Sequence, residues 1–189
     1  MIPNLPNLLT VTRVAIIPVL VGMFYVEAEW ARWALLGLFV YAAVTDWLDG
    51  WLARRLDQAT SFGRFMDPIA DKLLVVTALL MIAAFDRITA LSVIAVVLIL
   101  GREFVISGLR EFLADLRVAG LPVSPLAKWK TATQMIAVGL LLLGDGPLDP
   151  LPIQTAGEVL LWAAAVLTTV TGWDYVGKAV TQIRTRVTG

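Results

Sequence analysis

Four aspartates fall close together in segments that are otherwise strongly apolar: Asp46, Asp49, Asp67 and Asp71. A carboxylate near hydrocarbon is costly and like charges repel, so such residues indicate a functional site. Residues three, four or seven apart share one face of a helix. The spacing therefore predicts one acidic stripe that includes Asp46 and Asp49, and a second that includes Asp67 and Asp71.

The two stripes are joined by a short loop, so we expect them to face one another. Carboxylates gathered in this way raise each other's pKa unless cations lie between them. The chain contains no cysteine and no histidine, so a metal must be bound by oxygen, as Mg²⁺, Mn²⁺ and Ca²⁺ prefer. Two-metal sites stabilise both the attacking and the leaving oxygen in displacement at phosphorus.

Neighbouring residues fit the same chemistry. Gly50, Ala53 and Gly63 leave room for a ligand near the backbone, and Arg54 supplies a cation suited to phosphate. The structural alternative is a set of helix-end carboxylates paired with nearby basic side chains, namely Arg54, Arg55, Arg64 and Lys72. The complete spaced pattern, with its glycines, favours the functional interpretation.

The composition predicts an integral membrane protein. The 189 residues are 59% hydrophobic and 16% charged, against roughly 45–50% and about 25% in soluble domains. We expect one all-α domain over 1–189, with six transmembrane helices and a short interfacial helix before the first. The apolar stretches are Leu8–Tyr25, Trp33–Trp51, Pro68–Phe85, Ile88–Val105, Thr131–Leu143 (beginning earlier) and Gly157–Val176.

Six spans put both termini on one side of the membrane. All but two of the 15 Lys and Arg residues then fall on that side, the exceptions being Arg32 and Arg87. Positive charge concentrates in cytoplasmic segments. The distribution therefore predicts that both termini and the aspartates face the cytoplasm.

The pattern Asp46-x2-Asp49-Gly50-x2-Ala53-Arg54-x8-Gly63-x3-Asp67-x3-Asp71 resembles the signature of the CDP-alcohol phosphotransferases, membrane enzymes that move a phosphatidyl or similar group from a CDP-linked lipid to an alcohol. Further segments are similar to the bacterial phosphatidylglycerophosphate synthase branch. They are Asn4–Arg13, Asp67–Lys72, Gly101–Glu103, Ser107–Glu111 and Lys128–Thr131. The resemblance covers about residues 1–140, and the last apolar stretch looks generic.

The resemblance implies roles for individual residues. Asp46, Asp49 and Asp67 would bind Mg²⁺ or Mn²⁺, as a pair of ions, and Asp71 would be the general base and also a metal ligand. The CDP-diacylglycerol would be met by Asn7, Thr10, Asp49, Gly50, Ala53, Arg54, Thr60 and Gly63. The acceptor, glycerol 3-phosphate, would be bound through its phosphate by Arg102, Arg110 and Lys130. Lys128 and Lys130 point in different directions on a helix, and we favour Lys130. A homodimer in the bacterial inner membrane is also implied.

Four alternatives stay open. The enzyme could use another acceptor, such as serine, inositol phosphate or phosphatidylglycerol, although the basic residues favour a phosphorylated one. The protein could instead be a cation transporter, but the charges gather at one membrane face and no inverted repeat is visible. Asn7 and Thr10 could simply cap a helix, and the basic residues could be membrane-interface anchors, with Glu103 and Glu111 beside two of them.

Overall fold

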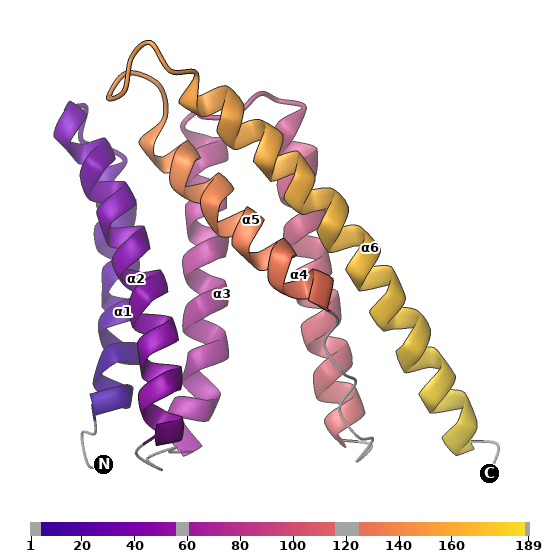
Figure 1. The fold of residues 1–189 in the computed structure, drawn as a ribbon. Helices are drawn as coiled ribbons and strands as arrows, with labels where there is room; N and C mark the ends of the chain where they lie inside the picture. The colour runs from indigo at the N-terminus through magenta and orange to yellow at the C-terminus, as the bar shows by residue number, and fades with distance from the viewer. Residues whose placement is uncertain (1–4, 56–60, 116–124, 188–189) are drawn as a thin grey trace. The chain divides into compact units, whose positions relative to one another are not determined.

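The structure is a computed structural model that describes residues 5–55, 61–115 and 125–187, with side chains except at 5–7, 49–55, 61–65, 125, 127–128 and 185–187. All regular elements in these ranges are helices, as Figure 1 shows. They are α1 (Leu5–Met23), α2 (Glu29–Arg55), α3 (Ser61–Ala84), α4 (Ser92–Asp115), α5 (Pro125–Leu143) and α6 (Ile153–Val187).

The helices agree with the predicted apolar stretches, and each stretch overlaps one helix. The predicted earlier start of the fifth stretch is confirmed, since α5 begins at Pro125. The expected separate interfacial helix is wrong within the described residues. Helix α1 runs without a break from Leu5, with Pro6 in its first turn, where a missing backbone N–H costs nothing.

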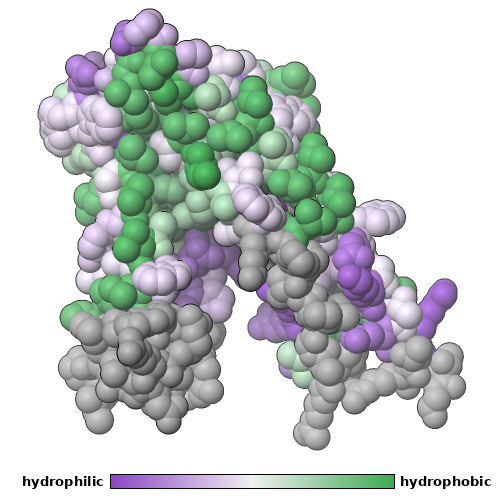
Figure 2. Space-filling model, in the orientation of Figure 1, coloured by the Kyte–Doolittle hydropathy of each residue, from purple (hydrophilic) through white to green (hydrophobic). Residues whose placement is uncertain are grey.

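Two helices in the described part of the chain, α4 and the Ile153–Arg184 part of α6, are long and apolar enough to cross a membrane. Large apolar side chains also face outward along the helices, and Figure 2 shows many of them on one face. Val97 is 62% exposed and Val159 is 63% exposed. Exposed apolar surface on this scale is typical of contact with lipid or another protein.

The chain divides into two compact units, of which the first comprises residues 1–88 and 138–157. Within it, α1 packs against both α2 and α3. Apolar side chains from all three helices are buried, including Leu20, Leu35, Leu74 and Ile82. Helix α1 is therefore the central element of this group. The expectation of a single domain over 1–189 stays a prediction.

Two arginines of the first unit cap the C-terminal end of α5. The Arg32 guanidinium donates to the carbonyl oxygen of Leu143, at 3.3 Å, and to that of Asp145. Arg87 donates to the carbonyl of Leu142 and lies 4.7 Å from the centre of the Phe24 ring. Carbonyls at a helix end have no intrahelical partner and attract cations. Burial, followed by the charge of Arg32, lowers the pKa of Arg87 to about 10, which leaves it charged at neutral pH.

The second unit comprises residues 89–137 and 158–189, and Glu158 of α6 joins the start of α4 to α6. Its carboxylate accepts hydrogen bonds from the backbone N–H of Thr89 at 3.1 Å, from the Thr89 hydroxyl at 2.7 Å and from the Ser92 hydroxyl. Trp162 of α6 donates to the same Ser92 hydroxyl at 3.2 Å. A carboxylate at a helix N-terminus satisfies open donors and matches the helix dipole. These bonds fix the register of α6 against α4.

Replacing Glu158 with alanine should destabilise the second unit, because three donors lose a charged acceptor. We expect the loss to be about 1–2 kcal/mol, measured as a lower melting temperature of the purified protein in detergent. Glu111→Ala, at an exposed position of α4, is the matched control and should melt like the wild type. Equal melting of the two variants would contradict the capping role.

Candidate active site

A fully buried arginine of α1 is bonded to the first aspartate of the motif. The Nη1 atom of Arg13 donates to the Oδ1 atom of Asp46 in α2, at 2.6 Å. The Arg13 side chain is 0% exposed, whereas that of Asp46 is 44% exposed. A buried guanidinium needs an opposite charge and hydrogen bonds to offset its desolvation. The contact therefore fixes Asp46 against α1 while leaving part of its carboxylate accessible.

A second residue on the same helix is bonded to the third aspartate. The Thr10 hydroxyl, buried in α1, donates to Oδ1 of Asp67 in α3 at 2.6 Å. Thr10 and Arg13 are three residues apart and therefore lie on one face of α1. The structure thus brings Asp46 and Asp67, from different helices, to the same turn of α1. This supports the predicted approach of the two acidic stripes.

The remaining motif residues are only partly described. Asp71 is exposed on α3, one helical turn beyond Asp67. Asn7, Asp49, Gly50, Ala53, Arg54 and Gly63 have side chains outside the described set, and Thr60 lies outside it altogether. Among the described residues, no group of three or more His, Cys, Asp or Glu is placed to bind a metal. The predicted four-carboxylate cluster therefore stays a prediction.

The donor chemistry of the described aspartates nevertheless fits a hard divalent ion. All of these donors are carboxylate oxygens, which suit Mg²⁺ and Mn²⁺. The bonds from Arg13 and Thr10 each use one oxygen of a two-oxygen carboxylate. Hydrogen bonds of this kind orient metal-binding carboxylates in other proteins. Asp46 and Asp67 therefore fit the role of metal ligands.

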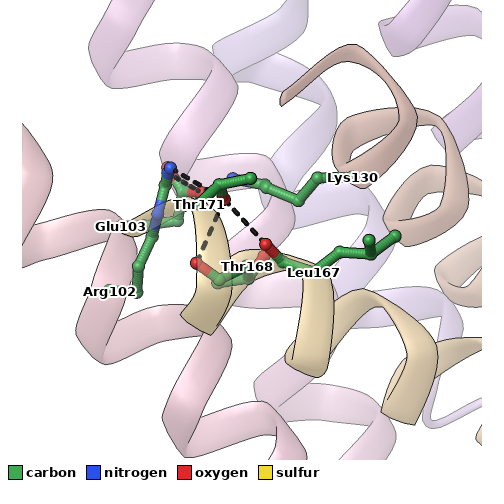
Figure 3. Close-up of polar contacts among 6 residues, drawn as sticks. All are labelled: Arg102, Glu103, Lys130, Leu167, Thr168 and Thr171. Atoms are coloured by element: carbon green, nitrogen blue, oxygen red, sulfur yellow. Dashed lines mark hydrogen bonds and ion pairs between the residues drawn. The ribbon is translucent and has the colours of Figure 1, made fainter. Parts of the chain in front are cut away.

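The predicted acceptor-binding residues lie in the second unit, and two of them meet at one carboxylate. Glu103 Oε1 accepts a hydrogen bond from Arg102 at 3.2 Å and one from the Lys130 ammonium (Figure 3). Lys130 is buried in α5, with 5% of the residue exposed, whereas the Lys128 side chain lies outside the described set. Arg102 and Arg110 both lie within electrostatic range of Lys130. Arg102 and Lys130 thus share one anionic side chain, so this group keeps a net positive charge that attracts a further anion.

The structure adds residues to which the sequence assigns no role in the site. Arg13 and Glu103 lie in segments that resemble the family, but the sequence predicts no contact of Arg13 with Asp46 and none of Glu103 with Lys130. In α6, Tyr175 lies under the Arg110 guanidinium, 5.3 Å from the ring centre. The signal for Arg13 was present in the sequence, because a charge within an apolar stretch and three residues after Thr10 requires a polar partner.

Comparison with known proteins identifies the family. Residues 3–170 match the family model described as CDP-alcohol phosphatidyltransferase. The chain belongs to this family, as the aspartate motif predicted.

Curated relatives are similar over most of the chain. A protein of Rickettsia bellii named CDP-diacylglycerol–glycerol-3-phosphate 3-phosphatidyltransferase is 46% identical, over 91% of this chain and 93% of its own. One of the same name from Cereibacter sphaeroides is 40% identical over 96% and 97% of the two chains. A cardiolipin synthase (CMP-forming) of Oryza sativa is 40% identical over 87% of this chain and 54% of its own.

The bond between Thr10 and Asp67 can be tested with an isosteric substitution. Thr10→Val removes the donor while keeping the buried volume, so Asp67 loses its orientation. We expect an approximately 10- to 100-fold weaker Mn²⁺ affinity, as for outer-shell partners of metal ligands, measured by titration of the purified protein. Thr12→Val is the control, since Thr12 donates only to the Leu9 carbonyl of its own helix among the described contacts. An unchanged Mn²⁺ affinity in Thr10→Val would contradict this role.

Proposed function

We propose that this protein transfers the phosphatidyl group of CDP-diacylglycerol to glycerol 3-phosphate, giving phosphatidylglycerophosphate and CMP. The observation that carries the proposal is the anchoring of Asp46 and Asp67 to one turn of α1. These aspartates belong to a motif typical of the family that the chain matches. The names of the bacterial relatives favour this donor and this acceptor.

The metal site in this proposal consists of Asp46, Asp49, Asp67 and Asp71, with two Mg²⁺ or Mn²⁺ ions. When bound, such ions neutralise pyrophosphate charge and polarise the phosphorus that will be attacked. Arg13 and Thr10 hold the carboxylates of Asp46 and Asp67 toward α1. Fixed ligands reduce the reorganisation that binding requires.

The nucleotide and pyrophosphate of the donor are assigned to residues around the same motif. They are Asn7, Thr10, Asp49, Gly50, Ala53, Arg54, Thr60 and Gly63. The small residues let the ligand approach the backbone, and the Arg54 guanidinium pairs with phosphate oxygens. The Thr10 hydroxyl donates a hydrogen bond to Asp67. Thr10 therefore contributes to donor binding by orienting Asp67.

The proton transfer is assigned to Asp71, which is exposed on α3. Its carboxylate removes the proton of the primary hydroxyl of glycerol 3-phosphate. The resulting oxygen forms a bond to the phosphorus that carries diacylglycerol, and the bond from this phosphorus to the bridging oxygen of CMP breaks. CMP leaves with that oxygen, and the phosphodiester product stays in the membrane. Arg102, Arg110 and Lys130 bind the acceptor phosphate, which their combined charge favours.

The membrane arrangement is part of the proposal. All six helices cross the bacterial inner membrane, with both termini and the aspartates on the cytoplasmic side, and two copies form a homodimer. The positive-inside distribution supports the orientation, and the exposed apolar side chains support burial in lipid. The dimer is an expectation taken from the family.

A related transferase is the second candidate, favoured by the relative from Oryza sativa, whose name is cardiolipin synthase (CMP-forming). The discriminating experiment offers the purified protein CDP-diacylglycerol with glycerol 3-phosphate, serine, inositol phosphate or phosphatidylglycerol. We expect CMP release with glycerol 3-phosphate, a phosphatidylglycerophosphate product by mass spectrometry, and loss of release in EDTA that Mg²⁺ or Mn²⁺ restores. A different lipid product would overturn the acceptor assignment, and release of no CMP with any acceptor would favour the cation transporter.

The general base can be tested separately. Asp71→Asn keeps the size of the side chain but removes its ability to accept a proton. We expect kcat to fall by about 10²- to 10⁴-fold, the usual contribution of such a group. Asp174→Asn, on exposed α6 surface, should keep wild-type turnover. Near-normal turnover by Asp71→Asn would refute the assignment.

A further inference from the structure

Three residues of α6 lie against two arginines of α4. Thr171 and Gly172 contact Arg102, and Tyr175 contacts Arg110. The closest approach is at Gly172. A Cβ atom added there would lie 2.8 Å from Cγ and 3.2 Å from Nε of Arg102. Real Cβ atoms essentially never come within 3.0 Å of another heavy atom, so any larger residue must displace the Arg102 side chain. Gly172 therefore creates the space in which Arg102 lies.

The residue before this glycine gives Arg102 a polar contact. The Thr171 hydroxyl donates to the carbonyls of Leu167 at 2.7 Å and Thr168 at 3.2 Å, as Figure 3 shows. The Thr171 hydroxyl oxygen accepts a long hydrogen bond of 3.5 Å from Nη2 of Arg102. The Thr171 oxygen is held by its own helix, so the guanidinium meets a fixed acceptor. Glu103 accepts a second hydrogen bond from the same guanidinium, donated by its Nη1.

One turn further along α6, Tyr175 makes the corresponding contact with Arg110. Thr171 and Tyr175 are four residues apart, on one face of the helix. A guanidinium within about 6 Å of an aromatic ring centre is attracted to the ring face. The same face of α6 therefore holds both arginines, and the Glu158 bonds to Thr89 and Ser92 fix the register of that face.

We propose that Thr171, Gly172 and Tyr175 are positioning residues that hold Arg102 and Arg110 in the conformation that binds the acceptor phosphate. The proposal rests on the proposed function. An arginine side chain that is not restrained loses rotamer entropy when it binds a ligand. Contacts that restrict it beforehand reduce this cost. Helix α6 thus determines the affinity for the phosphorylated acceptor without touching it.

The main test is a pair of glycine substitutions in the full-length protein. Gly172→Ala displaces Arg102. Gly177→Ala adds the same methyl group to α6 where, apart from its chain neighbours and the adjacent backbone of α6, no heavy atom of the described residues lies within 4 Å. We expect Gly172→Ala to raise the KM for glycerol 3-phosphate about 10- to 100-fold, the scale of a small misplacement, with the KM for CDP-diacylglycerol unchanged. Gly177→Ala should keep both values. Equal behaviour of the two variants, or a parallel rise in both KM values, would overturn the proposal.

Tyr175 provides an independent test with a conservative rescue. Tyr175→Leu removes the ring and should raise the KM for glycerol 3-phosphate about two- to fivefold, the strength of an exposed cation–π contact. Tyr175→Phe keeps the ring and should restore the wild-type KM. A Tyr175→Phe variant as impaired as Tyr175→Leu would contradict the role assigned to the ring.

Phosphate binding separates this proposal from the proposed function. Inorganic phosphate should raise the melting temperature of the wild type and of Gly177→Ala, but not that of Gly172→Ala. This result in a protein that releases no CMP with glycerol 3-phosphate would support the positioning role and contradict the proposed acceptor. The same rise in all three proteins would contradict the positioning role, and no rise in any of them would contradict an anion site at these arginines.

Discussion

The buried charge of Arg13 is the constraint on which the first unit depends. A guanidinium with no exposed surface is tolerable only beside an opposite charge, and Asp46 supplies it from α2. The need to pair this charge therefore sets where α2 lies against α1. Thr10, on the same face, fixes α3 through Asp67. The bonds of Arg13 to Asp46 and of Thr10 to Asp67 thus determine both the packing of the three helices and the placement of two proposed metal ligands. A change that weakens one of these bonds affects the packing and the ligands together.

In the second unit, the pairing of α4 with α6 has a comparable role. Glu158 satisfies the donors at the start of α4, which sets the register of the two helices. Further along, that register brings Gly172 against Arg102 and Tyr175 against Arg110. Apolar side chains alone would allow the helices to slide, because contacts between smooth apolar surfaces are not directional. A polar cap at one end therefore determines the geometry of cations several turns away.

The helices and the aspartate motif could be predicted from the sequence because both depend on local signals. Apolar stretches located α1 to α6, and the spacing of Asp46 and Asp67 indicated their function. Contacts between residues far apart in the sequence could not be predicted from local signals. The positive-inside rule accounts for a basic residue at Arg13 but does not predict its bond to Asp46. The last helix looks generic in the sequence because the role of Gly172 depends on its contact with Arg102, which is 70 positions away in the chain. The separate interfacial helix is wrong within the described residues, where α1 is continuous from Leu5, because Pro6 begins a helix as readily as it precedes one.

The two arginines that depart from the charge asymmetry have a structural explanation. Arg32 and Arg87 both donate to carbonyls at the end of α5, and Arg87 also lies over Phe24. Both guanidinium groups stabilise the end of α5 through these carbonyls. The positions of Arg32 and Arg87 are therefore explained by where α5 ends. In the six-span arrangement predicted from the sequence, all the other basic residues fall on the cytoplasmic side, as the positive-inside rule requires. This strengthens the proposed orientation, which brings the aspartates to the cytoplasmic side, where a water-soluble phosphorylated acceptor is available.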